Sequence, residues 1–71
     1  MEFYQLKTFI TVAKTKNVTR AAAELNTTPP SVSNHIKQLE EELNTTLFTR
    51  TTKGMQITSQ GKILVSKAQD I

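Results

Sequence analysis

TTPPSVSNHI (residues 27–36) decides how this chain folds. Two prolines stand where a helix can begin, because the first helical residues have no intrahelical partner for an N–H group. Apolar residues then follow at spacings of four, three and four positions: Val32, Ile36, Leu39 and Leu43. This spacing predicts a helix over about residues 30–42 whose narrow apolar stripe faces inward.

The start of this helix determines what its outer face can do. Because a proline disfavours helical dihedral angles in the residue before it, we expect Pro30 rather than Pro29 to be the first helical residue. Thr28 can cap the helix or touch a phosphate, and the unpaired N–H groups and dipole of a helix start attract phosphate. The outer face is polar and uncluttered: Pro30, Asn34, Lys37, Gln38 and Glu41. A purely structural helix would begin equally well with these residues.

Two helices are predicted before this one. From Glu2 to about Thr15, apolar residues recur every three or four positions: Phe3, Leu6, Phe9, Ile10 and Ala13. After a polar break, Thr19 is expected to cap a second helix of about seven residues, with Val18 packing back on it from outside the cap. The polar turn at residues 26–28 joins the second helix to the third.

The rest of the chain predicts a hairpin and a fourth helix. Residues 47–50 and 55–58 are short and rich in strand formers, and Gly54 in the turn between them can take a positive φ. Thr58 or Ser59 can then cap a helix with one shared face: Gly61, Leu64, Val65, Ala68 and Ile71. The pattern stops on an apolar residue, which suggests a fragment of something longer. The expected fold is mainly α, a winged helix-turn-helix with three helices, a two-stranded wing and the start of a linker helix.

Length and composition exclude several classes of protein. The chain has 71 residues, enough for one small domain, and no cysteine, so neither a disulfide framework nor a cysteine zinc site can support it. No apolar run approaches the roughly 18 residues of a membrane span, and the start lacks the order of a secretory signal. We therefore expect a soluble cytoplasmic protein with no membrane partner.

The distribution of charge favours DNA as a partner. The net charge is +3, and residues 38–49 hold three acids and no base. These acids, Glu40 to Glu42, oppose the dipole of the third helix, which makes sense if only its N-terminal half enters a groove. Salt bridges to lysines would also explain the acids, and charges of this size also serve to keep a small domain soluble.

Two helices joined by a short turn, the second polar outside, describe a helix-turn-helix. Only short or flexible polar side chains fit against base edges, and Ser31, Ser33 and Asn34 have this character. Lys37 can reach a base or a phosphate. Arg50 and Lys53 flank a hairpin tip of threonine and glycine, so the wing at residues 50–54 can lie in the minor groove or along the backbone, although a basic turn can also be simply solvated.

Over essentially all 71 residues the chain resembles the N-terminal winged helix-turn-helix of LysR-type bacterial transcriptional regulators. The resemblance rests on motifs in every predicted element: Leu6-Lys7-Thr8-Phe9, Val12-Ala13, Val18-Thr19-Arg20-Ala21-Ala22, Leu25, Pro30-Ser31-Val32-Ser33, Ile36, Gln38-Leu39-Glu40, Leu43, Leu47-Phe48-Thr49-Arg50 and Ile57-Thr58-Ser59-Gln60-Gly61. The combination is specific, whereas a lone helix-turn-helix pattern would be weak.

The resemblance implies a sequence-specific DNA-binding domain at residues 1–58 and the start of a linker and dimerisation helix at residues 59–71. It implies that the full-length regulator binds double-stranded promoter DNA as a homo-dimer or tetramer, with the fourth helix as the linker helix through which two chains pair. We predict that this fragment dimerises weakly through Leu64, Ala68 and Ile71 on the shared face of that helix. It also implies a missing C-terminal domain that binds a small effector. The contacts it implies for DNA are Thr19, Thr28, Pro30, Ser33, Asn34, Lys37, Arg50 and Lys53.

Three positions depart from the usual pattern of that family. Pro29 stands where glutamine is common, Asn34 where arginine is common, and Asn44 where a glycine usually follows the third helix. The first two changes remove long side chains that would reach bases or phosphates, so the base preference of relatives does not transfer. Asn44 is a milder change, because asparagine tolerates the left-handed conformation.

Other classes of function fit less well. His35 is the only histidine and has no cysteine or second histidine to join it, so we expect no enzyme, metal or cofactor, and place His35 at the edge of the core or near a phosphate. A module that binds a partner helix would need an apolar outer face on the third helix. Another winged-helix regulator, such as the molybdate-responsive type, remains the alternative within DNA binding.

Overall fold

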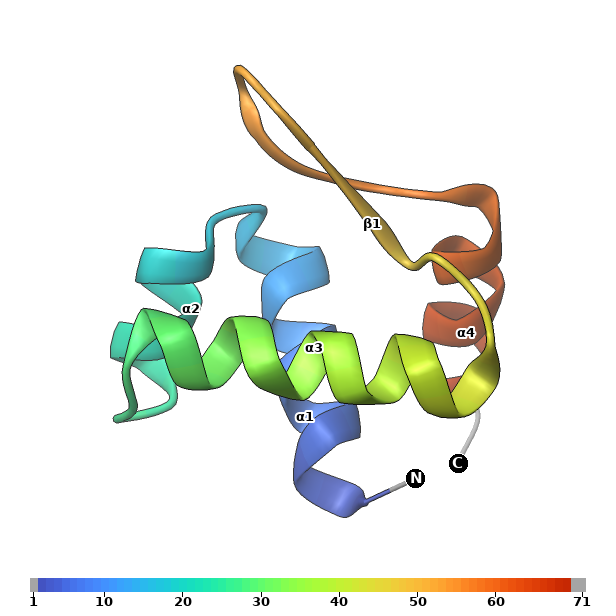
Figure 1. Cartoon of the computed structure of the whole chain (residues 1–71), viewed down its shortest axis with the longest axis horizontal. Helices are drawn as coiled ribbons and strands as arrows, with labels where there is room; N and C mark the ends of the chain where they lie inside the picture. The colour runs from blue at the N-terminus through green and yellow to red at the C-terminus, as the bar shows by residue number, and fades with distance from the viewer. Residues whose placement is uncertain (1, 70–71) are drawn as a thin grey trace.

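The computed structural model describes residues 2–69, and within them the chain forms four helices and a two-stranded sheet (Figure 1). The elements are α1 (Phe3–Thr15), α2 (Val18–Glu24), α3 (Pro29–Leu43), β1 (Phe48–Thr51), β2 (Gly54–Ile57) and α4 (Ser59–Gln69). In Figure 1, α3 lies across the front with α1 behind it, and the hairpin rises above them. The predicted order of helices and hairpin is confirmed.

The core forms where α1, α2 and α3 meet under the base of the hairpin. Its buried apolar side chains are Phe9, Val12, Ala21, Ala22, Val32, Ile36, Leu39, Leu47 and Phe48. The rings of Phe9 and Phe48 pack with centroids 5.4 Å apart, which joins α1 to the first strand of the hairpin. The buried residues of α3 are Val32, Ile36 and Leu39, which are three of the four residues of the predicted stripe.

Polar contacts add a second connection between α1 and α3. Gln5 is buried, and its Nε2 donates to Gln38 Oε1 at 3.1 Å, while its Oε1 accepts from the backbone N–H of Glu2. Thr8 Oγ1 lies 3.2 Å from Nδ1 of His35. Because these bonds satisfy buried polar atoms, they favour one placement of α3 across α1.

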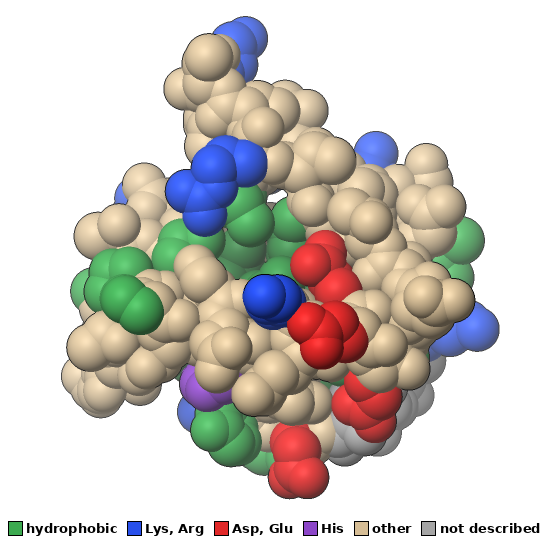
Figure 2. Space-filling model, viewed as in Figure 1, with side chains coloured by type: hydrophobic (Ala, Val, Ile, Leu, Met, Phe, Trp, Pro, Cys, Tyr) green, Lys and Arg blue, Asp and Glu red, His purple; other side chains and the backbone are tan. Residues whose placement is uncertain are grey.

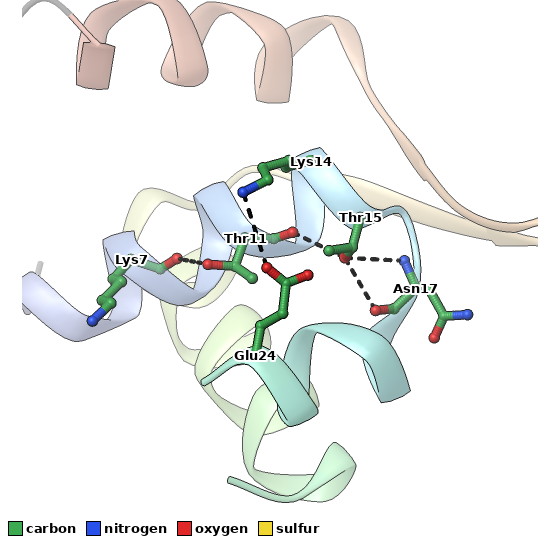
Figure 3. A network of polar contacts seen from close by, with 6 residues as sticks. All are labelled: Lys7, Thr11, Lys14, Thr15, Asn17 and Glu24. Atoms are coloured by element: carbon green, nitrogen blue, oxygen red, sulfur yellow. Dashed lines mark hydrogen bonds and ion pairs between the residues drawn. The ribbon is translucent and has the colours of Figure 1, made fainter. Parts of the chain in front are cut away.

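The start of α2 differs from the prediction. Asn17 rather than Thr19 is the N-cap: its backbone is extended and its Oδ1 accepts from the N–H of Arg20 at 3.0 Å, so Val18 is the first helical residue and not a staple outside the cap. The chain reaches this geometry because Lys16 takes a left-handed conformation (φ 57°) and the hydroxyl of Thr15 accepts the N–H of Asn17 (Figure 3). Asparagine is also a better N-cap than threonine.

The bounds of α3 also correct the prediction. The helix begins at Pro29, one residue earlier than expected, with Thr28 as the N-cap. Neither of the first two helical residues has an intrahelical partner for an N–H, so both prolines fit without losing a hydrogen bond. At the other end Asn44 takes the left-handed conformation that we expected (φ 52°).

Two apolar residues assigned to inward stripes are instead exposed. Leu43, in the last turn of α3, is 37% exposed and faces α4 across a shallow groove. Phe3 is 80% exposed and lies in the first turn of α1, beside a second groove that Ala68 of α4 also lines. Helical spacing predicts a shared face but not how far the neighbouring elements cover it.

The chain between α3 and the hairpin is held from both sides. The carboxylate of Glu40 accepts the N–H groups of Leu47 and Phe48 at 2.7 and 3.3 Å. From the other side, the hydroxyl of Thr58 donates to the carbonyl of Thr46 at 2.7 Å, and its N–H donates to the carbonyl of Leu47 at 2.9 Å. We refer to residues 46–48 as the 46–48 segment. Through these hydrogen bonds it links α3, the hairpin and the start of α4.

Thr58 has a second role at the start of α4. Its Oγ1 accepts the N–H of Gly61 at 3.0 Å, so of the two expected caps, Thr58 is the one used. Gly61 is buried where α4 approaches the 46–48 segment, and a Cβ on it would lie 2.6 Å from both the carbonyl oxygen of Leu47 and Cγ1 of Ile57. A glycine therefore sets how closely α4 packs.

The hairpin is antiparallel, with Phe48 opposite Ile57 and Thr51 opposite Gly54. Only Thr52 and Lys53 form the turn. The turn end of the hairpin rests on the end of α1, where the N–H of Met55 donates to the carbonyl of Lys16 at 3.2 Å. A Cβ on Gly54 would lie 2.7 Å from the same carbonyl oxygen, and its φ of 113° is unfavourable for other residues, so this position requires glycine.

We expect Gly61→Ala to destabilise the domain by about 1 to 3 kcal/mol, because the added methyl must push α4 away from the 46–48 segment. Urea unfolding monitored by circular dichroism measures this change. Ser66→Ala, at an exposed position of the same helix, is the control and should leave the free energy of unfolding within about 0.5 kcal/mol. If the Gly61→Ala variant is as stable as the control, α4 does not pack closely against the 46–48 segment at this position.

The two candidate caps of α2 can be separated by mutation. Asn17→Ala should lower the free energy of unfolding by about 1 kcal/mol, because the N–H of Arg20 loses its acceptor. Thr19→Ala removes no cap and should change it by less than about 0.5 kcal/mol. The reverse order of effects would restore Thr19 as the cap.

Candidate nucleic-acid interface

The candidate site is built on the outer face of α3. Pro30, Ser33, Asn34 and Lys37 are exposed there, and Ser31 is half-buried at the first turn. Asn34 and Lys37 are three residues apart, so they lie on one side of the helix. The face offers short polar side chains and one long basic side chain, that of Lys37. It lacks the large apolar side chains that binding to a partner helix would need.

The first turn of α3 has no free backbone donor, contrary to our expectation of unpaired N–H groups. Pro29 and Pro30 have no N–H, that of Ser31 donates to Oγ1 of Thr28 at 3.3 Å, and that of Val32 donates to the carbonyl of Thr28 at 3.1 Å. Only the helix dipole remains to attract a phosphate.

The hydroxyl of Thr28 is also committed. It accepts from the N–H of Ser31 and donates to Oγ of Ser31 at 3.0 Å. The oxygen of the Ser31 hydroxyl accepts the bond from Thr28, so its own hydrogen can point away from the helix. Ser31 is the better donor to an external acceptor, and Thr28 positions it.

The wing brings together two candidate residues that are far apart in the sequence. Thr19 at the first turn of α2 and Arg50 on β1 both line one shallow pocket, whose other residues are Asn17, Val18, Thr51, Thr52, Gly54 and Met55. Lys53 is exposed at the turn of the hairpin and does not line this pocket. Thr19 and Arg50 therefore lie beside the same depression, while Lys53 lies at a separate point of the hairpin.

Charges divide along α3. Figure 2 shows acidic side chains gathered over the C-terminal half of the helix and basic side chains at its middle and on the hairpin above. Of the acids, Glu40 is bound to backbone N–H groups of the 46–48 segment rather than to a lysine. An ion pair does join Lys14 of α1 to Glu24 of α2 at 3.9 Å, between two largely exposed side chains (Figure 3).

His35 lies at the edge of the core, against α1. The hydroxyl of Tyr4 lies 3.2 Å from its Nε2, and the two rings meet edge to face with centroids 4.5 Å apart. Within residues 2–69, no three His, Asp or Glu side chains come together in a way that could hold a metal ion. Nor does any helix of that range have the length and apolar character to cross a membrane.

Two residues important to the site were not identified from the sequence. Asn17 caps α2 and lines the pocket beside Arg50. An asparagine just before a predicted helix is a common N-cap, so the sequence could have indicated this role. Glu40 was interpreted only through its charge. Its partners lie seven and eight residues away across an irregular connection, so no periodic pattern indicates the contact.

These features define a class of protein. A helix-turn-helix followed by a basic hairpin, with an exposed polar second helix, is a winged helix-turn-helix DNA-binding domain. Residues 3–62 match the family model described as bacterial regulatory helix-turn-helix protein, lysR family, and the chain belongs to that family.

Similar proteins agree with this assignment. The regulator CysL of Bacillus subtilis (strain 168) is 45% identical over all 71 residues, which span 24% of its length. The crystal structure of a CbnR_DBD–DNA complex is 34% identical with a TM-score of 0.94, covering 99% of this chain and 80% of that one. A LysR-family regulator from Eggerthella lenta DSM 2243 is 42% identical with a TM-score of 0.88 over the whole of both chains. The chain is thus a DNA-binding domain of transcriptional regulators, a family without enzymatic activity.

Proposed function

We propose that this domain reads promoter DNA by placing α3 in the major groove and residues 50–54 on the minor groove or backbone. The observation that carries the proposal is the outer face of α3, where exposed side chains are short or flexible and polar. The major groove of B-DNA is about 12 Å wide and admits one helix, provided that no bulky side chain holds it away.

Each exposed group then has a role set by its chemistry. Ser31, Ser33 and Asn34 bond to base edges, and the amide of Asn34 suits the N6 and N7 edge of adenine. Pro30 makes close apolar contact at the same edge, and Lys37, one turn further on, binds a phosphate or a base. Thr28 acts by capping α3 and orienting Ser31.

The wing and α2 supply contacts to the backbone. Arg50 and Thr19 line one pocket, and a phosphate there would be bound by a guanidinium and a hydroxyl. Lys53, at the exposed turn, reaches the backbone or the minor groove beyond it. Phosphate contacts of this kind fix the position of α3 in the major groove without carrying sequence information.

The whole protein is proposed to be a cytoplasmic bacterial regulator, with residues 1–58 as the DNA-binding domain and residues 59–71 as the start of a linker and dimerisation helix. The chain spans only 24% of the length of CysL, which leaves room for a C-terminal domain that binds a small effector. The full-length protein would bind DNA as a homo-dimer or tetramer.

Mutations on the two surfaces should have different effects on DNA binding. We expect Lys37→Ala and Arg50→Ala to weaken binding to a site selected from random DNA and to a scrambled duplex by similar factors, since both lose phosphate contacts. Asn34→Ala should reduce discrimination at particular base pairs by about 1 to 3 kcal/mol. Fluorescence anisotropy with single-base variants of the selected site measures both effects.

Lys67→Ala, which removes an exposed charge from α4, is the control and should have little effect. Affinity for either duplex should fall steeply between about 50 and 200 mM salt. If affinity does not change over that range, phosphate contacts do not drive binding and the proposed interface is wrong.

Self-association is proposed through α4. Leu64 and Ala68 are half-buried on it, and Ile71, the third residue expected to take part, lies outside the described residues. Ala68 lines the groove beside the exposed ring of Phe3, and Ile63 of the same helix is 57% exposed. A second copy of α4 covering these side chains would remove their apolar surface from water.

We expect the 71-residue chain to dimerise weakly and Ala68→Glu to abolish this, because the new carboxylate would be buried against apolar side chains. Sedimentation equilibrium at concentrations up to about 1 mM, the range of weak association, measures it. Ser66→Glu, exposed on α4, is the matched control. A wild-type chain that stays monomeric throughout would refute pairing through this surface.

A further inference from the structure

We propose that Glu40 is a positioning residue for DNA binding, which holds the wing at a fixed distance from the recognition face of α3. The inference rests on the proposed function, in which Arg50 and Lys37 bind the same DNA. Glu40 itself would touch no DNA. It would act through the 46–48 segment, whose N–H groups it binds.

Glu40 binds the connection between α3 and β1 with both its backbone and its side chain. Its carbonyl oxygen accepts the N–H of Thr45 at 3.0 Å. Its carboxylate accepts the N–H groups of Leu47 and Phe48 at 2.7 and 3.3 Å. Both of those residues are buried, so water cannot easily replace the carboxylate, and an ionised acceptor makes hydrogen bonds stronger than neutral ones.

The anchored strand leads directly to the wing. Phe48 is the first residue of β1 and Arg50 is two residues further, about 7 Å along an extended strand. On α3, Glu40 lies one turn after Lys37, on the helix that carries the recognition face. The carboxylate of Glu40 therefore links α3, which carries Lys37, to β1, which carries Arg50.

The other attachments of the wing join it to different elements. The N–H of Met55 binds the carbonyl of Lys16, which ties β2 to the end of α1. Thr58 binds the carbonyls of Thr46 and Leu47 and ties the 46–48 segment to α4. The carboxylate of Glu40, by contrast, joins α3 directly to Phe48, the first residue of β1, and to Leu47 before it.

The charge of Glu40 makes the proposal easy to test. A carboxylate one turn from Lys37 should repel DNA, so removing it would strengthen binding if charge were its only influence. If Glu40 positions the wing, Glu40→Ala should weaken binding in spite of the lost negative charge. The two explanations therefore predict changes of opposite sign.

The experiment measures the affinity of the 71-residue chain for a 24-base-pair duplex of mixed sequence over a range of salt concentrations. We expect Glu40→Ala and Arg50→Ala each to weaken binding about 5- to 10-fold and to reduce the salt slope by about one phosphate contact. The double variant should bind no more than about 2-fold more weakly than Glu40→Ala alone, because the wing contact is already lost. Glu40→Gln keeps an acceptor oxygen and should bind at least as tightly as the wild type.

Glu41→Ala is the matched control, since it removes an exposed carboxylate from the same helix and should bind DNA as tightly as the wild type or more tightly. Circular dichroism at the assay temperature establishes that each variant is folded. If Glu40→Ala does not fold, Glu40→Asp replaces it, because it keeps the charge and shortens the reach by one methylene. A purely electrostatic role then predicts unchanged binding, whereas the positioning role predicts the same loss of about 5- to 10-fold.

The outcomes separate this inference from the proposed function. If Arg50→Ala has no effect, the wing does not bind DNA and the proposed interface is wrong at that point. If Arg50→Ala weakens binding but Glu40→Ala strengthens it, Glu40 acts only as a charge. If the losses of the single variants multiply in the double variant, Glu40 does not act through the wing, and the positioning role is overturned.

Discussion

Hydrogen bonds to the 46–48 segment link α3, the hairpin and α4 to one another. Glu40 of α3 binds N–H groups of the segment, and Thr58 before α4 binds its carbonyls. Gly61 lets α4 approach closely enough for this arrangement. The N–H groups of Leu47 and Phe48 and the carbonyl of Leu47 are thus satisfied, which allows these two residues to be buried.

The capped start of α3 limits which groups the proposed DNA-binding surface can offer. Two prolines and the bonds to Thr28 leave no backbone donor at the position where many helices hold a phosphate. Electrostatic attraction must therefore come mainly from side chains, of which Lys37, Arg50 and Lys53 are the candidates. Contacts made by side chains, unlike those made by the backbone, change with every substitution.

The sequence alone predicted the element order, the inward stripe of α3, the hairpin and the family, because helical spacing and family motifs are local signals. The sequence did not predict features that depend on which of two nearby residues caps a helix, or on contacts between residues far apart in the chain. Asn17 and Thr19 were both suitable caps, and only the left-handed turn at Lys16 selects Asn17. The exposure of Phe3 and the role of Glu40 depend on elements that meet in space, and no spacing rule encodes them.

The exposed face of α3 is separate from the parts that hold the domain together. Ser33, Asn34 and Lys37 lie outside the core, whereas Val32, Ile36 and Leu39 on the same helix lie within it. Substitutions at exposed positions of this kind usually change stability by less than about 0.5 kcal/mol. Substitutions on this face can therefore accumulate almost independently of folding. If the face reads DNA as proposed, gene duplication followed by a few surface changes would give one scaffold a new set of target sequences.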